Sequence, residues 1–333
     1  MHIVATIRVS LIRKGIAVRK TTPAQQMTKT APAEMGSALV ARILAHTNCE
    51  GENRTAVPGL SLFRNNAPTV CNITSVEPGI TIFAQGKKQI SIRGIDYVCD
   101  AGSFLVASID LPIRSQIMQA THNVPQLAMR FLFDMQSVRE VVSREDLPEI
   151  QRSSERRGLA LGRTTTGLLN AGLRLIDLLD TPEDIPFLKH LIERELIYRI
   201  LQTPQGERLR AIATAGNLSQ KTAKAIAWLS ANYSRPLHME ELAEIARMGV
   251  STLHHQFRAL TGMSPLQFQK QLRLRVARER MLKDRLDATS AAYEVGYESV
   301  SQFNREYSRF FGQPPMRDIK AMRESNVVAI DAA

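Results

Sequence analysis

The chain has 333 residues, of which 44% are hydrophobic and 23% charged, and its formal net charge at pH 7 is +11. This length accommodates two or three domains, and the basic balance favours an acidic partner such as nucleic acid. No apolar run approaches membrane-spanning length, so no membrane partner is expected. Cys49, Cys71 and Cys99 are odd in number and form no CxxC pair, which favours the reducing cytoplasm and argues against a disulfide framework or zinc site.

The positive charge is concentrated in two parts of the chain. Residues 210–320 hold 17 basic and 10 acidic residues, a net charge of +7, and residues 1–33 hold six basic residues and no acid. The segment between them is close to neutral. A confined basic region is the electrostatic signature of a protein that binds duplex DNA.

Residues 1–35 are expected to form a disordered basic arm. Basic residues interrupt any apolar core there, so a signal peptide is not indicated. The arm also fits an over-long start, with Met27 or Met35 as the initiator. A short amphipathic helix is expected from Gly36 to His46, at the beginning of a domain that we assign to residues 36–205.

From Pro58 to Phe133 the apolar residues recur with a period of two. Short strands separated by turn signals at this spacing predict an antiparallel β-barrel or jelly roll. The apolar runs are Leu60–Phe63, Ile80–Phe83, Gln89–Arg93, Phe104–Val106 and Met129–Phe131.

Residues 163–204 are expected to be helical. One apolar stripe runs from Leu168 to Leu179, and Thr181-Pro182 indicates the start of a second helix, whose stripe includes Leu188, Leu191 and Ile192. The helical pair is predicted either to form a dimer interface or to pack on the barrel. Residues 205–220 read as a hinge.

A helix-turn-helix pattern occurs twice after the hinge, at 237–262 and 287–312. In the second copy Gly296 suits a turn with positive φ, Ser299 and Gln302 fit a capping box, and Phe303 and Tyr307 begin a buried face. A capped surface helix would look alike, but the repetition favours a double motif. The two copies are joined by an uninterrupted helix from Pro265 to Leu282, about 27 Å long at 1.5 Å per residue. Successive major grooves lie about 34 Å apart, so the two copies could enter adjacent grooves.

The C-terminal third resembles the DNA-binding domain of the AraC/XylS family of bacterial transcription regulators. The domain is assigned to 206–324, with a frayed tail at 325–333. Gly249 departs from the family pattern, which usually has Ser there, and weakens the helix cap. The matching residues are Ala225–Leu229, Pro236-Leu237, Leu242-Ala243, Leu253-His254, Phe257-Arg258, Thr261–Pro265, Arg273-Leu274, Ala277-Arg278, Val295–Tyr297, Ser301–Phe303, Arg305, Phe310–Gly312 and Pro315.

The resemblance implies which side chains face DNA. Arg305 is the foremost of these, since arginine can read guanine bidentately. Adjacent histidines do not share a helix face, so a metal site at His254-His255 is the less favoured alternative. The expected DNA contacts are Ser251, His254, His255, Val300, Ser301, Gln302, Asn304 and Arg305, and the expected phosphate contacts are Lys270, Arg273, Arg278 and Arg309.

The strand-rich segment resembles the cupin-like N-terminal domain of a subgroup of the same family, and this resemblance implies an effector in the barrel interior. The resemblance is carried by Pro58–Leu60, Gln85–Lys88, Asp100–Gly102 and Ala107–Pro112. Only His122 falls in the barrel, which argues against a metal-dependent cupin enzyme, and no cofactor is expected. Cys71 and Cys99 fit either a redox-sensing site near the effector or buried apolar packing. Asp110-Leu111-Pro112 fits either a pocket lining or a tight turn.

The sequence thus predicts an α+β multidomain protein: an N-terminal antiparallel β-barrel of the cupin-like jelly-roll type with flanking helices, and a C-terminal all-α domain of two helix-turn-helix motifs joined by a long helix. The expected function is sequence-specific transcription regulation without catalysis. The expected partners are double-stranded operator DNA, a small-molecule effector, a second copy of the chain in a homodimer, and RNA polymerase. A non-specific nucleoid-type binder and a cupin-type enzyme remain alternatives.

Overall fold

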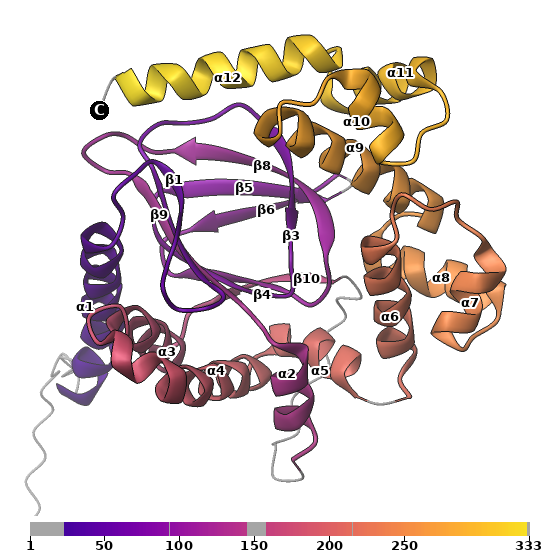
Figure 1. The fold of residues 1–333 in the computed structure, drawn as a ribbon. Coiled ribbons are helices and arrows are strands. Elements are labelled where there is room, and N and C mark those ends of the chain that lie inside the picture. The colour runs from indigo at the N-terminus through magenta and orange to yellow at the C-terminus, as the bar shows by residue number, and fades with distance from the viewer. Residues whose placement is uncertain (1–22, 93, 145–157, 215, 332–333) are drawn as a thin grey trace, which may run out of the picture.

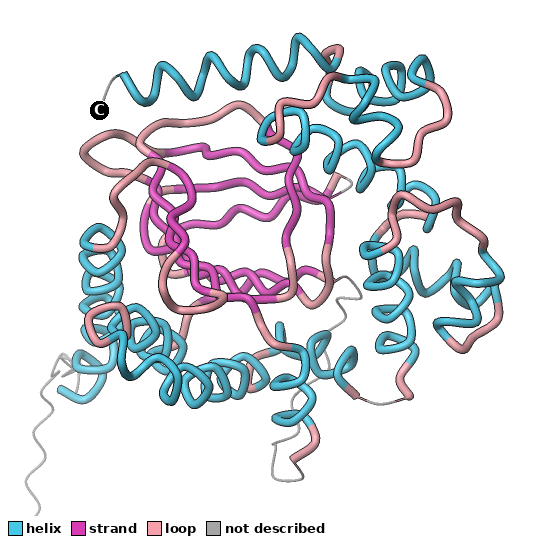
Figure 2. The backbone as a smooth tube through the Cα atoms, in the orientation of Figure 1, coloured by secondary structure: helices cyan, strands magenta, loops and turns pink. Residues whose placement is uncertain are grey.

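A computed structural model of the chain describes residues 23–92, 94–144, 158–214 and 216–331. The strands gather in one block, and helices lie on several sides of it (Figure 1, Figure 2). The helices of the last third of the chain lie beside this block (Figure 1).

The larger sheet has six antiparallel strands in the order β1-β2-β9-β4-β7-β10. Four of the five runs predicted to be strands fall in β2, β4, β7 and β9 of this sheet, and the fifth, Gln89–Arg93, overlaps β5 (Lys87–Ile92) of the smaller sheet; β1 and β10 were not expected. The strands are β1 (Gly51–Arg54), β2 (Leu60–Asn65), β4 (Gly79–Gln85), β7 (Ser103–Ala107), β9 (Gln126–Leu132) and β10 (Leu159–Arg163).

The smaller sheet has four antiparallel strands in the order β3-β8-β5-β6, and the two sheets are not joined into one closed barrel. Asp110 precedes β8 and lines a cavity, and Leu111-Pro112 begin the strand, so of the two alternatives the structure favours the pocket lining over the tight turn. The strands are β3 (Asn72–Val76), β5 (Lys87–Ile92), β6 (Ile95–Asp100) and β8 (Leu111–Gln119).

Both faces of the larger sheet are covered, one by helices and the other by the smaller sheet. Successive side chains of a strand point to opposite sides, so neighbouring residues pack into different cores. Met129 and Phe131 of β9 pack with the helices, while Ala128, the residue before Met129, faces the smaller sheet. Helices α1 (Pro23–Ala45), α3 (Thr166–Asp177) and α4 (Ile185–Leu201) cover the first face (Figure 1). The space between the two sheets is therefore a second core, distinct from the core under the helices.

Helix boundaries in the N-terminal part differ from the sequence expectation. Helix α1 begins at Pro23, so residues 23–35 are helical rather than disordered, and residues 1–22 lie outside the described part. Leu191 of α4 is 51% exposed and does not belong to the buried stripe. Pro182 starts a short 3₁₀ turn, Pro182–Asp184, and α4 follows it directly.

The hinge expected at 205–220 contains structure of its own. A 3₁₀ turn, Pro204–Gly206, leads into α5 (Glu207–Ala213), and α6 begins at Leu218. Helix α2 (Met135–Val142) packs near α5.

The C-terminal part is entirely helical, and each predicted helix-turn-helix is present. Helix α12 continues to Asp331, so the tail expected after residue 324 is helical up to that point. The helices are α6 (Leu218–Ala231), α7 (Met239–Ala246), α8 (Val250–Thr261), α9 (Pro265–Lys283), α10 (Ala288–Glu294), α11 (Val300–Phe311) and α12 (Pro315–Asp331).

Among the residues that the structure describes, hydrogen bonds at three places join the β-domain to the C-terminal helices. The Gly158 amide donates to the Leu260 carbonyl at the end of α8 (3.0 Å). The Ser230 hydroxyl donates to Asp110 (3.3 Å), and Arg278 of α9 donates to Asn72 of β3 (2.7 Å). The helix-turn-helix pair is therefore attached to the β-domain at three separated points.

Candidate nucleic-acid interface

The first helix-turn-helix comprises α7, a three-residue turn and α8. The turn reverses at Arg247, which is in the left-handed region (φ 51°), and the Met248 amide donates to the Ala243 carbonyl (3.1 Å). Gly249 occupies the N-cap of α8 without a side-chain hydrogen bond, as its lack of a side chain requires. Leu253 and Phe257 are fully buried, so the opposite side of α8 faces outward.

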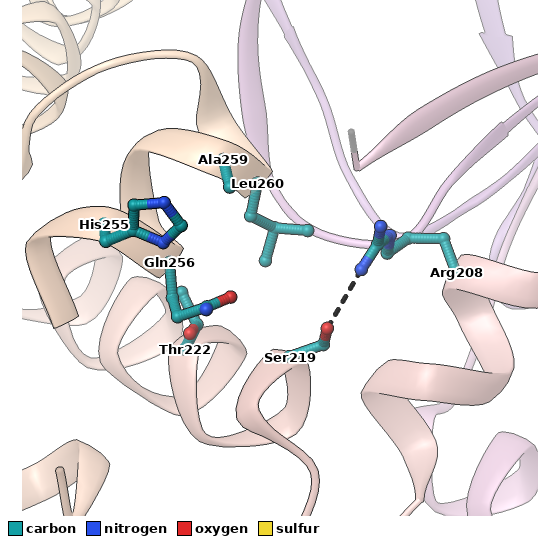
Figure 3. Close-up of a pocket in the computed structure, with 7 residues that line it drawn as sticks. All are labelled: Arg208, Ser219, Thr222, His255, Gln256, Ala259 and Leu260. Carbon is teal, nitrogen blue, oxygen red and sulfur yellow. Dashed lines mark hydrogen bonds between the residues drawn. The ribbon is translucent and has the colours of Figure 1, made fainter. Parts of the chain in front are cut away.

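Ser251, His254 and His255 lie on that outward side and are exposed. His255 also borders a cavity of about 230 Å³ between α8 and the helices α5 and α6. Figure 3 shows His255 and Gln256 across from Ser219 of α6, which accepts a hydrogen bond from Arg208 (2.9 Å). His255 therefore lies toward the edge of the outward surface and His254 away from that cavity.

The second turn brings the backbone very close to another segment. Gly296 has φ +88°, and a Cβ placed on it would lie 2.0 Å from the Ser234 carbonyl oxygen. Only glycine combines this φ with this approach. The prediction of Gly296 as the turn residue is confirmed.

Ser299 caps α11 by accepting a hydrogen bond from the Gln302 amide (3.3 Å). The expected capping box is half formed, because the Gln302 side chain donates instead to Glu306 (3.1 Å). In a complete capping box the Gln302 side-chain oxygen would accept a hydrogen bond from the Ser299 backbone N–H, whereas the observed bond to Glu306 holds the Gln302 side chain along the helix surface.

Helix α11 separates a buried from an exposed side. Phe303 and Tyr307 are fully buried, and their rings lie 5.5 Å apart. The exposed side holds residues expected to contact DNA, and Val300 at the start of the helix is half-buried. The exposed members are Ser301, Gln302, Asn304, Arg305 and Arg309.

Glu306 anchors α11 to α9 and to the second turn. Its carboxylate accepts hydrogen bonds from Lys270 of α9 (2.6 Å) and from the Tyr297 hydroxyl (2.8 Å). Burial acts to raise the pKa of Glu306, but the hydrogen bonds from Lys270, Gln302 and Tyr297 outweigh it and lower that pKa. Lys270 is thus held in an ion pair while 40% of its side chain stays exposed.

Two of the expected phosphate contacts, Arg273 and Arg278, form hydrogen bonds within the protein. Arg273 donates to backbone carbonyls of Tyr233, Ser234, Arg235 and Gly296, at 2.7 to 3.1 Å. It therefore joins the segment between α6 and α7 to the second turn.

Arg278 likewise points into the protein. Its guanidinium forms two hydrogen bonds with the buried Asp318 (2.7 and 2.8 Å), and only 13% of its side chain is exposed. Its third nitrogen, Nη1, donates to Asn72 of the β-domain. Of the four expected phosphate contacts, Arg309 keeps an exposed position on a recognition helix, and Lys270 is shared with Glu306.

Comparison with known sequences places both parts of the chain. Residues 56–208 match the family described as AraC-type transcriptional regulator N-terminus, and residues 242–320 match a helix-turn-helix domain family. The chain belongs to the AraC/XylS family. These are families of transcriptional regulators rather than of enzymes.

Within the AraC/XylS family the chain is similar to transcriptional activators named RhaS. It is 29% identical to that of Pectobacterium carotovorum over 136 residues, which are 41% of this chain and 47% of the relative. It is 34% identical to that of Yersinia pestis over 94 residues, which are 28% of this chain and 34% of the relative. The chain thus spans less than half the length of these relatives.

Among solved structures, the chain resembles ToxT of Vibrio cholerae. A ligand-free ToxT variant gives a TM-score of 0.55 at 10% identity, covering 80% of this chain and 98% of ToxT. ToxT with a bound unsaturated fatty acid gives 0.51 at 13% identity, covering 78% and 93%. At these identities the similarity concerns the fold, and it supports the predicted fold class.

Proposed function

We propose that this AraC/XylS family member is a sequence-specific DNA-binding regulator of transcription that responds to a small molecule bound in its β-domain. The observation that carries the proposal is the pair of helix-turn-helix units, joined in the chain by α9, each of which presents an exposed second helix, α8 or α11. Helix α9 has 19 residues and is about 28 Å long, close to the roughly 34 Å repeat of the major groove. The exposed sides of α8 and α11 present polar and cationic side chains, as base readout requires.

The proposed DNA contacts follow from exposure and position. We assign base contacts to Ser251 and His254 on α8 and to Ser301, Asn304 and Arg305 on α11, with His255, Val300 and Gln302 at the margins. Phosphate contacts are assigned to Arg309 and, through its exposed part, to Lys270. Because its target is the chromosome, the protein is placed in the cytoplasm.

A homodimer is part of the proposal. Phe187, Leu191 and Tyr198 on one face of α4 are 74%, 51% and 38% exposed. Their spacing of four and eleven residues places them on one side of the helix. An apolar stripe of this kind on a surface helix is suited to packing against its own copy. The activator names of the RhaS relatives favour activation through RNA polymerase as the regulatory outcome.

The test is salt-dependent binding of the full chain to a fragment enriched from genomic DNA, against a scrambled fragment of equal composition. We expect a preference of about a thousandfold and an affinity that falls steeply between 50 and 200 mM salt. Equal affinity for both fragments would favour the nucleoid-type binder and refute sequence-specific regulation.

A further inference from the structure

A cavity of about 140 Å³ lies between the two sheets of the β-domain. Its walls come from both sheets, and much of the lining is apolar, including Phe63, Phe83, Ile90 and Leu105. The volume is comparable with the roughly 150 Å³ cavity that accommodates a benzene ring. The cavity is thus suited to a small molecule with an apolar body.

Lys88 brings a positive charge to this cavity. Along β5, Lys88 shares its face with Ile90 and Ile92, both buried between the sheets, because residues two apart point to the same side. The Lys88 ammonium lies 6.0 Å from the centre of the Phe63 ring. Among the described residues, no carboxylate forms an ion pair with Lys88.

Two further donors line the cavity without an acceptor. Gln126 is 1% exposed, and its amide oxygen accepts from Asn65 (2.9 Å), which leaves its Nε2 without a hydrogen-bond partner. The Arg130 Nε is also buried and without a hydrogen-bond partner, although its terminal nitrogen pairs with Glu52 (2.5 Å). Buried donors are nearly always satisfied, so a missing acceptor is the expected explanation.

Neither Glu52 nor Cys99, which lie near Lys88, supplies an anionic acceptor for it. Glu52 is engaged by Arg130, so it neutralises only one of the two cations. Cys99, from β6, is a neutral thiol at physiological pH, since burial raises its pKa to about 12. Desolvation chiefly, with Arg130 nearby, lowers the pKa of Lys88, and an anion beside it would reverse this effect.

We propose that this cavity is the effector site and that it binds a small carboxylate, with the anionic group among Lys88, Arg130 and Gln126 and the apolar body against Phe63 and Phe83. The assignment rests on the proposed function as an effector-responsive regulator. Glu52, Thr74, Ser75 and Arg130 also line a groove that faces α9 of the DNA-binding domain. A carboxylate bound to Arg130 would therefore contact a residue that lines both the cavity and the groove facing α9.

The test measures thermal unfolding and calorimetric binding of the full chain with benzoate and butanoate, and with neutral benzamide as the uncharged comparison. We expect at least one carboxylate, and not benzamide, to bind the wild type and to raise its Tm. Lys88→Met should weaken that binding by about tenfold or more, since a charge-assisted hydrogen bond is lost. Lys87→Met is the matched control, because Lys87 is the neighbouring residue and its side chain is exposed.

Lys88→Met should fold, because it replaces an unpaired charge with an apolar chain of similar length. Gln126→Glu gives a second variant that keeps the acceptor for Asn65 and repels a carboxylate, so it should also lose binding. The proposal is overturned if neither carboxylate binds, if Lys88→Met binds as well as Lys87→Met, or if only inorganic phosphate binds. Operator binding without carboxylate, measured on the same samples, reports separately on the proposed function.

Discussion

Arg305 lies on the exposed side of α11, opposite the buried Phe303 and Tyr307. Among the described residues it has no ion-pair partner, so its guanidinium is available for bidentate contact with a guanine. Arg305→Ala should cost about 1–3 kcal/mol at one operator position and leave non-specific binding nearly intact. Competition binding against single-base operator variants measures this, with Lys87→Ala as a distant control. Uniform weakening on every sequence would instead identify Arg305 as a phosphate contact.

Lys88 gives a pH prediction for the ligand-free protein. Its pKa is lowered in the folded state, chiefly by desolvation, so between that pKa and the ordinary value of about 10.4 the unfolded chain binds more protons. The free energy of unfolding should therefore increase as pH rises through this window. Arg130, Cys99 and Glu52 are the charged or titratable groups nearby, and they remain in Lys88→Met. Urea unfolding from pH 7 to 10.5 should show this increase in the wild type and not in Lys88→Met. The same pH dependence of the free energy of unfolding in both proteins would contradict the prediction.

At the scale of the element, the second turn depends on Gly296. Gly296 and Gly312 have nearly the same φ, +88° and +85°, but nothing lies within 4 Å of a Cβ placed on Gly312. Gly312→Ala should cost only the left-handed strain, about 1–2 kcal/mol. Gly296→Ala adds the clash with the Ser234 carbonyl and should cost about 1–3 kcal/mol more. Urea unfolding of the two variants compares them directly, and equal losses would mean that the turn relaxes without cost.

A buried ion pair holds α12 to α9 and α11. Asp318 is 7% exposed and accepts from Arg278 and from the Tyr307 hydroxyl (2.7 Å). Asp318→Ala leaves Arg278 without its partner and should destabilise the protein by about 3–5 kcal/mol. Asp284→Ala, at an exposed pair with Arg280, should change stability by less than about 1 kcal/mol. A loss at Asp318 as small as that at Asp284 would show that water replaces the pair.

Local patterns in the sequence predicted the elements that repeat or alternate. The two helix-turn-helix units, the Gly296 turn and strands such as β4 and β9 were found because their signals lie within a few adjacent residues. The partners of Arg273 and Arg278, which were expected to contact phosphates, could not be found in this way because they are distant in the sequence: Tyr233 is 40 residues from Arg273, and Asp318 is 40 residues from Arg278. Position on a helix shows that a side chain faces outward from that helix, but not what lies opposite it.

At the scale of the whole molecule, the β-domain and the DNA-binding domain are joined at places that no single-domain pattern indicates. Asn72 meets Arg278, and Gly158 meets the last turn of α8. Both contacts reach helices next to the proposed DNA surface. A change in the β-domain can therefore shift the population of DNA-binding arrangements, provided that the effector favours one of them.

The exposed stripe on α4 gives the prediction for the assembly. Phe187→Asp places a charge in the proposed dimer interface, at its most exposed apolar residue, where burying it without a partner is costly. We expect this variant to sediment as a monomer at concentrations where the wild type is a dimer, and to bind an operator with two half-sites more weakly by about tenfold or more. Val70→Asp changes an equally exposed residue, 83% accessible and outside α4, and should leave the mass unchanged. A wild-type chain that sediments as a monomer at every concentration tested would refute the dimer, and the two operator half-sites would then be bound independently.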